Sequence, residues 1–87
     1  MSTKDPFLTA AQDVTQLSKR PDNNILLKLY ALYKQGESGD ASGPRPGMLD
    51  IKARKKFDSW ASQKGVSRDE AKKQYVILVS ELKKNNT

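Results

Sequence analysis

The sequence predicts an all-α protein of four helices, and three observations lead to this class. Apolar residues recur at helical spacing in four segments, residues suited to helix capping precede several of them, and no segment alternates like a half-buried strand. The chain has 87 residues, which suffice for one small domain over residues 1–87. Because it has no cysteine for a disulfide, one efficient core must hold the fold.

The helices are expected over about residues 6–18, 23–37, 51–63 and 67–84. Residues typical of helix N-termini precede three of them: Asp5 before Pro6, Asp22 or Asn23, and Ser67 in an S-x-x-E pattern with Glu70. The second helix is apolar around most of its circumference. We therefore expect it to lie at the centre of the fold.

The connection between the second and third helices is long for so small a domain. Residues 38–47 hold three of the five glycines and two of the four prolines, and Met48, Leu49 and Asp50 extend the connection. Long ordered loops are often functional. The alternative, which we favour, is a rigid spacer whose Met48 and Leu49 pack into the core.

The composition excludes several kinds of function. Without histidine or cysteine the chain has no catalytic triad of the Ser-His-Asp or Cys-His type, no histidine base, and no thiolate or imidazole metal ligand. We therefore expect a protein that is not an enzyme and holds no metal. No apolar run is long enough to span a membrane, and the residues from Met1 to Pro6 do not resemble a signal peptide, so we expect a cytoplasmic protein.

The charge indicates an anionic partner. The net charge is +6, and the excess of basic residues lies in the second half of the chain. The densest group is Lys52, Arg54, Lys55 and Lys56. Such a surface suits a nucleic acid, an anionic membrane or a phosphorylated small molecule, although a solvated surface with no partner is an equal alternative.

Phenols and ammonium groups at helical spacing form a candidate anion site. Neighbouring helical positions carry Tyr30, Tyr33 and Lys34 on the second helix and Lys52 and Lys56 on the third, and the fourth helix adds Tyr75. Aromatic rings can stack on a base, while hydroxyl and ammonium groups bond to phosphate oxygens. For each tyrosine alone, the simpler interpretation is a residue at the edge of the core with its hydroxyl in water.

Three motifs resemble the acyl-CoA-binding protein family. They are Leu29-Tyr30-Ala31-Leu32-Tyr33-Lys34-Gln35, then Gly39-Asp40 with Arg45-Pro46-Gly47-Met48-Leu49-Asp50, and finally Phe57 and Trp60 followed by Gly65-Val66-Ser67, Glu70-Ala71 and Tyr75. The resemblance covers about residues 7–82. It implies an up-down-down-up four-helix bundle with a long loop between helices two and three. It also implies non-catalytic binding and intracellular transport or buffering of long-chain acyl-CoA esters, which are ligands rather than cofactors.

The resemblance also assigns roles to residues. Tyr30, Lys34 and Lys56 would contact the 3′-phosphate of CoA, Tyr33 would stack near the adenine, and Tyr75 would lie beside the ribose and adenine. Lys52 would lie at the edge of this site. The family motif also places Ala31 and Leu32 among the ligand-binding residues. An apolar groove for the acyl chain would be bordered by Leu27, Phe7 and Ala10.

The chain departs from the family pattern at four positions. Thr15 stands where a basic residue is frequent, which puts one phosphate contact in doubt. Gly36 should fray the end of the second helix, and Ala53 in place of a common glycine should be harmless or mildly stabilising. Phe57 replaces a frequent tryptophan and lacks its indole donor, while Trp60 is expected in the core.

Two other functions stay open on the residues alone. One is a small basic helical module that binds nucleic acid through Lys52–Lys56, and the other is a membrane-surface module that uses the same basic face with the first helix. The resemblance favours the acyl-CoA carrier, a monomer that binds no nucleic acid. Transient contact with a membrane or with an enzyme that uses acyl-CoA is compatible with it.

Overall fold

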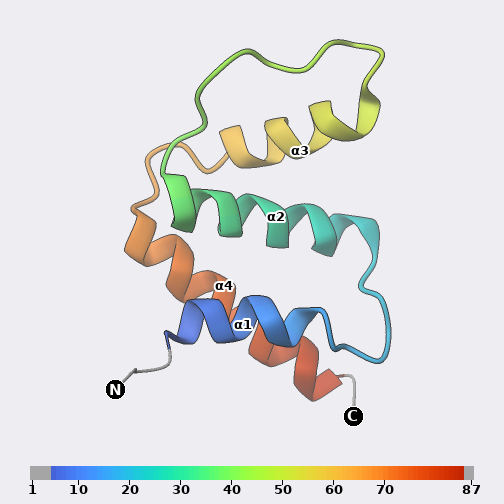
Figure 1. The fold of residues 1–87 in the computed structure, drawn as a ribbon, viewed down its shortest axis with the longest axis vertical. Coiled ribbons are helices and arrows are strands. Elements are labelled where there is room, and N and C mark those ends of the chain that lie inside the picture. Colours follow the sequence, from blue (N-terminus) through green and yellow to red (C-terminus); the bar gives the residue numbers. More distant parts are fainter. Residues whose placement is uncertain (1–4, 86–87) are drawn as a thin grey trace.

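The computed structural model describes residues 5–85, which form four α-helices (Figure 1). These are α1 (Pro6–Val14), α2 (Asn23–Ser38), α3 (Ile51–Ala61) and α4 (Arg68–Asn85). The described residues contain no strand, so the predicted all-α class is confirmed. Both ends of the expected domain, residues 1–4 and 86–87, lie outside the described residues. The N-terminal segment that does not resemble a signal peptide lies mostly in the first of these ranges.

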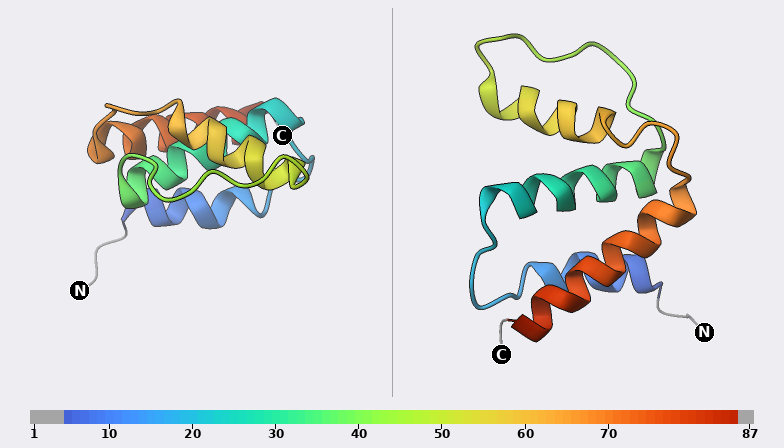
Figure 2. Two further views of the ribbon diagram at one scale, coloured as in Figure 1. Left: turned by 90° about the horizontal axis from the view of Figure 1, so that it is seen from above. Right: turned by 180° about the vertical axis from the view of Figure 1, so that it is seen from behind.

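The helices follow the up-down-down-up order, with α2 and α3 running in one direction and α1 and α4 in the other (Figure 1). As predicted, α2 is central: it packs against α3 and α4, whereas α1 packs against α4. Because α2 and α3 are parallel, the chain must return over their length between them. The loop of residues 39–50 does this along the side of α3 that faces away from α2 (Figures 1 and 2).

Side-chain caps begin all four helices, and the predicted caps are confirmed. Each capping oxygen accepts a hydrogen bond from a backbone amide of the first turn, which would otherwise lack a partner. The bonds are Phe7 N to Asp5 (2.9 Å), Ile25 N to Asp22 (2.9 Å), Ala53 N to Asp50 (3.3 Å) and Glu70 N to Ser67 (3.0 Å).

Two helices end earlier than predicted. The first, α1, ends at Val14 rather than near residue 18, because the Thr15 hydroxyl donates to the Gln12 carbonyl at 2.7 Å and competes with the helical backbone bonds. The third, α3, ends at Ala61 rather than near residue 63. There the amide of Gln63 bonds to the carbonyl three residues before it, at 2.9 Å, and this tighter turn replaces the α-helix.

Gly36 does not end α2, which continues beyond it. A Cβ atom at Gly36 would lie 2.9 Å from Cγ of Lys72 and 3.2 Å from the Phe7 ring, so the glycine permits close approach of α4 and of that ring. The Arg68 side chain donates to the carbonyls of Gly36 (3.3 Å) and Glu37 (2.9 Å). These carbonyls belong to the last turn and would otherwise lack partners, so Arg68 supports the helix end.

The core lies between α1, α2 and α4. A cluster of buried side chains there comprises Phe7, Ala10, Leu29, Leu32, Tyr75 and Val79. Burying a leucine such as Leu32 completely stabilises the fold by about 1.5–3 kcal/mol. Since α3 contributes no buried residue, Trp60 is only partly buried and the expectation that it belongs to the core is wrong.

The loop of residues 39–50 is held against α3, but not by its apolar residues. The indole nitrogen of Trp60 donates to the Gly39 carbonyl at 2.8 Å, and the Arg45 guanidinium pairs with both carboxylate oxygens of Asp58 at 2.8 and 2.7 Å. Met48 and Leu49 are 78% and 99% exposed, so the prediction that they pack into the core is wrong. The reason is the route of the loop, which passes outside α3 while the core lies on the far side of α2 (Figure 1).

Two carboxylates should make the stability depend on acid pH. Hydrogen bonds from the Gly65 amide and Gln35 lower the pKa of Asp40 below its usual 3.8, and the Arg45 pair lowers the pKa of Asp58 below 3.8. Because both pKa values are depressed on folding, their contribution is present above 3.8 and is lost as pH falls through the folded-state values. The free energy of unfolding, measured by urea titration, should therefore fall below about pH 4.

Asp58→Asn provides the control for this prediction. The variant lacks the ion pair at every pH, so it should be less stable than the wild type near pH 7 and approach it near pH 2. A stability difference that stays constant over this range would contradict the assignment to Asp58.

Candidate functional site

An aromatic cluster joins α1, α2 and α4. The ring of Phe7 stacks on Tyr33 with centroids 5.2 Å apart and meets Tyr75 edge-on at 5.3 Å, and the two tyrosine rings are 5.8 Å apart. Tyr75 is 4% exposed. Burial, and secondarily the nearby Tyr33, raise the pKa of the Tyr75 hydroxyl, which therefore stays protonated and able to donate a hydrogen bond at neutral pH.

A mainly apolar hollow of about 330 Å³ opens beside this cluster, where the backbones of α1 and α2 stay apart. Its lining comprises Ala11, Leu29, Tyr30, Tyr33 and Tyr75. The three tyrosines predicted from the sequence are thus brought together in one hollow. Apolar walls with a few converging hydroxyl groups are typical of small-molecule sites.

Lys56 links α3 to this hollow. Its ammonium nitrogen lies 5.4 Å from the centre of the Tyr30 ring. A cation at that distance is attracted by the ring and adds a positive charge at the tyrosine. Lys52, one turn earlier on α3, is exposed, so a second cation lies on the same helix.

Lys34 points to α3 rather than into the hollow. Its ammonium nitrogen lies 4.9 Å from the centre of the Trp60 ring and 3.6 Å from a carboxylate oxygen of Glu37. The other oxygen of Glu37 accepts a hydrogen bond from the Tyr33 hydroxyl at 3.4 Å. Lys34 is therefore connected to Tyr33 through Glu37. The sequence analysis missed Glu37, although it follows Lys34 by three and Tyr33 by four residues, the spacing of neighbours on a helix.

The remaining predicted site residues take different places. Ala31 and Leu32 are 2% and 1% exposed, so their side chains belong to the helix packing. Phe7 and Ala10, each 5% exposed, form part of the core beside the hollow, and Leu27 is partly buried on α2. The sequence analysis did not place Ala11 and Leu29 in the site, although Ala11 follows Phe7 by one helical turn.

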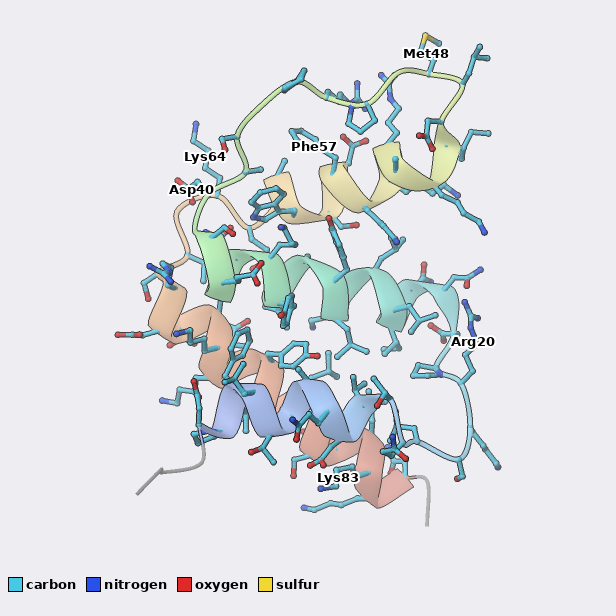
Figure 3. The ribbon with its side chains drawn as sticks, viewed as in Figure 1. Arg20, Asp40, Met48, Phe57, Lys64 and Lys83 are labelled. Carbon is cyan, nitrogen blue, oxygen red and sulfur yellow. The ribbon has the colours of Figure 1, made fainter. Side chains whose placement is uncertain are left out.

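Two departures from the family pattern lie outside the hollow. Thr15 is exposed at the end of α1 and does not line it. Phe57 lies on the side of α3 that faces the loop (Figure 3), with its ring edge-on to Trp60 at 6.2 Å. The missing indole donor at Phe57 therefore leaves the tyrosine-lined hollow unchanged.

Comparison with known proteins gives one consistent result. The family model described as acyl-CoA-binding protein matches residues 4–79. The chain belongs to the acyl-CoA-binding protein family. Acyl-CoA-binding protein homolog 1 of Caenorhabditis elegans is 49% identical over 76 residues, which cover 87% of this chain and 88% of the relative. A homolog of Manduca sexta is 45% identical over 83 residues, or 94% of this chain and 92% of the relative.

Solved acyl-CoA-binding proteins have the same fold. The crystal structure of acyl-CoA-binding protein 2 from Oryza sativa gives a TM-score of 0.88 at 34% identity and covers 92% of this chain and 89% of that one. The solution structure of the acyl-CoA-binding protein from yeast gives a TM-score of 0.75 at 37% identity. The match covers 97% of this chain and 98% of that one.

The family binds acyl-CoA as a ligand, catalyses no reaction and uses no cofactor. Residues 5–85 contain no group of three or more acidic side chains arranged to hold a metal ion. None of the helices that the structure describes has the length and apolar character to cross a bilayer.

Proposed function

We propose that this acyl-CoA-binding protein carries and buffers long-chain acyl-CoA esters, with the CoA head group held by tyrosine and lysine side chains. The observation that supports this most is the hollow shared by Tyr30, Tyr33 and Tyr75, with Lys56 at its rim. A hollow with phenol groups and a cation suits a ligand that combines an aromatic base with phosphates. The apolar lining suits the part of the ligand nearest the acyl chain.

The proposed contacts are those that the family resemblance implies, and the positions of the side chains support them. Lys56 and Tyr30 bind the 3′-phosphate together. The ammonium group of Lys34 breaks its ion pair with Glu37 and contacts the same phosphate. Tyr33 stacks near the adenine, and the protonated hydroxyl of Tyr75 lies beside the ribose and adenine.

Other residues surround this head-group site. Lys52 contributes charge at its edge. Phe7, Ala10 and Leu27 border the acyl chain, and Ala31 and Leu32 act only by supporting α2 from within.

The contacts of the cations favour this carrier over a nucleic-acid-binding module. The ammonium groups of Lys34 and Lys56 lie over aromatic rings, at 4.9 and 5.4 Å. Nucleic acid binding draws much of its affinity from several cations along a phosphate backbone, whereas these two ammonium groups are held at separate aromatic rings. We propose a cytoplasmic monomer that binds no nucleic acid and meets membranes or acyl-CoA-using enzymes only transiently.

Calorimetric titration with a sixteen-carbon acyl-CoA tests the proposed function. The ester should bind at one-to-one stoichiometry and far more tightly than free CoA or the free fatty acid. Each buried CH₂ group contributes up to about 0.8 kcal/mol, so a long chain supplies on the order of 10 kcal/mol before the costs of binding. The phosphates add selectivity, because a free acid brings none to the lysines. Equal affinity for the free acid, or no binding of the ester by folded protein, would contradict the proposal.

Glu37→Gln should tighten binding of the ester. The substitution removes the carboxylate that competes with the ligand phosphate for Lys34, while the amide can still accept a hydrogen bond from Tyr33. A partly exposed ion pair contributes about 0.2–1 kcal/mol, so affinity should rise about 1.5- to 5-fold. Glu81→Gln makes the same charge change on an exposed part of α4 and is the matched control. Equal effects of the two substitutions would show that only net charge matters.

A further inference from the structure

An exposed apolar group stands where the long loop enters α3. Met48, Leu49 and Ile51, which we call the apolar tip, are 78%, 99% and 61% exposed. Figure 3 shows Met48 directed away from the rest of the molecule. Single exposed apolar residues are ordinary, but three within four positions make a group that marks an interaction surface.

The backbone of the tip is held in place. Arg45 fixes the loop to α3 through its paired bonds to Asp58 at 2.8 and 2.7 Å. The amide of Asp50 donates to the Gly47 carbonyl at 3.1 Å, and the Asp50 carboxylate accepts from the first turn of α3. The tip is therefore presented on a turn that these hydrogen bonds hold against α3, and its apolar side chains face outward.

Basic side chains follow the tip on α3. Lys52, Lys55 and Lys56 are exposed on α3, directly after Ile51. Asp58 is already paired with Arg45, and the one remaining carboxylate nearby, the helix cap Asp50, is outnumbered by these three lysines. The surface thus combines apolar side chains with positive charge, which complements an anionic lipid surface. A nucleic acid would use the lysines but gives the apolar side chains no place to be buried.

We propose that the apolar tip docks the protein on anionic bilayers. Met48, Leu49 and Ile51 enter the boundary between headgroups and acyl chains, and Lys55 contacts lipid phosphates. Lys56 follows Ile51 by about 8 Å along α3, at a rise of about 1.5 Å per residue, so docking places the proposed CoA site close to the membrane. Docking does not depend on that site, but its use for taking up or delivering acyl-CoA rests on the proposed function.

Co-sedimentation with vesicles, with no acyl-CoA present, tests the docking. The full chain should sediment with phosphatidylcholine vesicles that contain phosphatidylserine, and much less with phosphatidylcholine alone. Replacing both Met48 and Leu49 by serine should lower the partition coefficient about tenfold or more, because the inserting side chains are lost. Lys55→Glu should lower it about fivefold or more on the anionic vesicles alone. Ile77→Ser, at a residue 50% exposed on α4, is the matched control and should bind like the wild type.

Several results would overturn the proposal. One is equal binding of the wild type to both vesicle types, and another is unchanged binding after loss of Met48 and Leu49. A wild-type dimer in light scattering that the double serine variant abolishes would assign the tip to self-association instead.

Thermal unfolding checks that each variant is folded, and acyl-CoA titration of the double variant should match the wild type. Vesicle binding without acyl-CoA binding would reject the proposed function and leave the docking intact.

Discussion

Lys34→Ala should weaken binding of long-chain acyl-CoA about 30- to 150-fold. The substitution removes one partner of a charged contact with the ligand phosphate, and truncations of this kind cost about 2–5 kcal/mol when the contact is buried. The Lys34 side chain is 27% exposed in the free protein, so we expect the lower part of that range, about 2–3 kcal/mol. Calorimetry with the sixteen-carbon ester measures the effect directly.

Folding should change little in the same variant. Lys34 loses its pair with Glu37, which is 49% exposed, and its position over the Trp60 ring. Each of these contributes about 1 kcal/mol or less. The unfolding transition should therefore remain cooperative, and the affinity loss is a binding effect.

Lys28→Ala is the control for the lost charge. Lys28 is exposed on the same helix, so its removal changes the net charge by the same amount outside the site. It should alter the affinity about twofold or less, as expected for distant screened charges. If Lys34→Ala binds the ester as well as Lys28→Ala does, the phosphate site proposed at Lys34 is wrong.

The helices were predictable because their signals are local. Asp5, Asp22 and Ser67 are short polar residues placed before apolar periodic segments, and each caps a helix in the structure. The ends were less predictable, because small local competitions decide them. The hydroxyl of Thr15 ends α1 early, whereas α2 passes through Gly36, which packs under Phe7.

The site was predictable in its residues but less so in its directions. Helical spacing groups Tyr30, Tyr33 and Lys34, but spacing cannot say that the lysine turns to α3 while the tyrosines line the hollow. That division depends on which neighbour packs on each side of α2. The same limit explains the error at Met48 and Leu49, because their apolar character suggests burial until the route of the loop is known.

Trp60→Ala should destabilise the fold by about 3 kcal/mol. This is the lower end of the range for removing a large aromatic side chain, and we expect the lower end because Trp60 is only partly buried. Its ring meets Phe57 edge-on, lies under the Lys34 ammonium and donates to the Gly39 carbonyl at 2.8 Å. Since α3 has no buried residue of its own, these contacts of Trp60 with Lys34 and Gly39 help to hold α3 against α2 and the loop. A loss of this size should lower the melting temperature by roughly 12–24 °C.

Circular dichroism must follow this unfolding, because Trp60 is the single tryptophan of the chain and its replacement removes the fluorescent probe. Trp60→Phe separates the ring from its hydrogen bond: it should cost only about 1 kcal/mol, the usual value of one hydrogen bond, and should keep acyl-CoA binding. The opposite pattern, wild-type stability in Trp60→Ala with binding lost, would mean that Trp60 contacts the ligand. Lys34 would then have to act with the indole as one site, and the phosphate would lie between α2 and α3 rather than at the rim of the tyrosine-lined hollow.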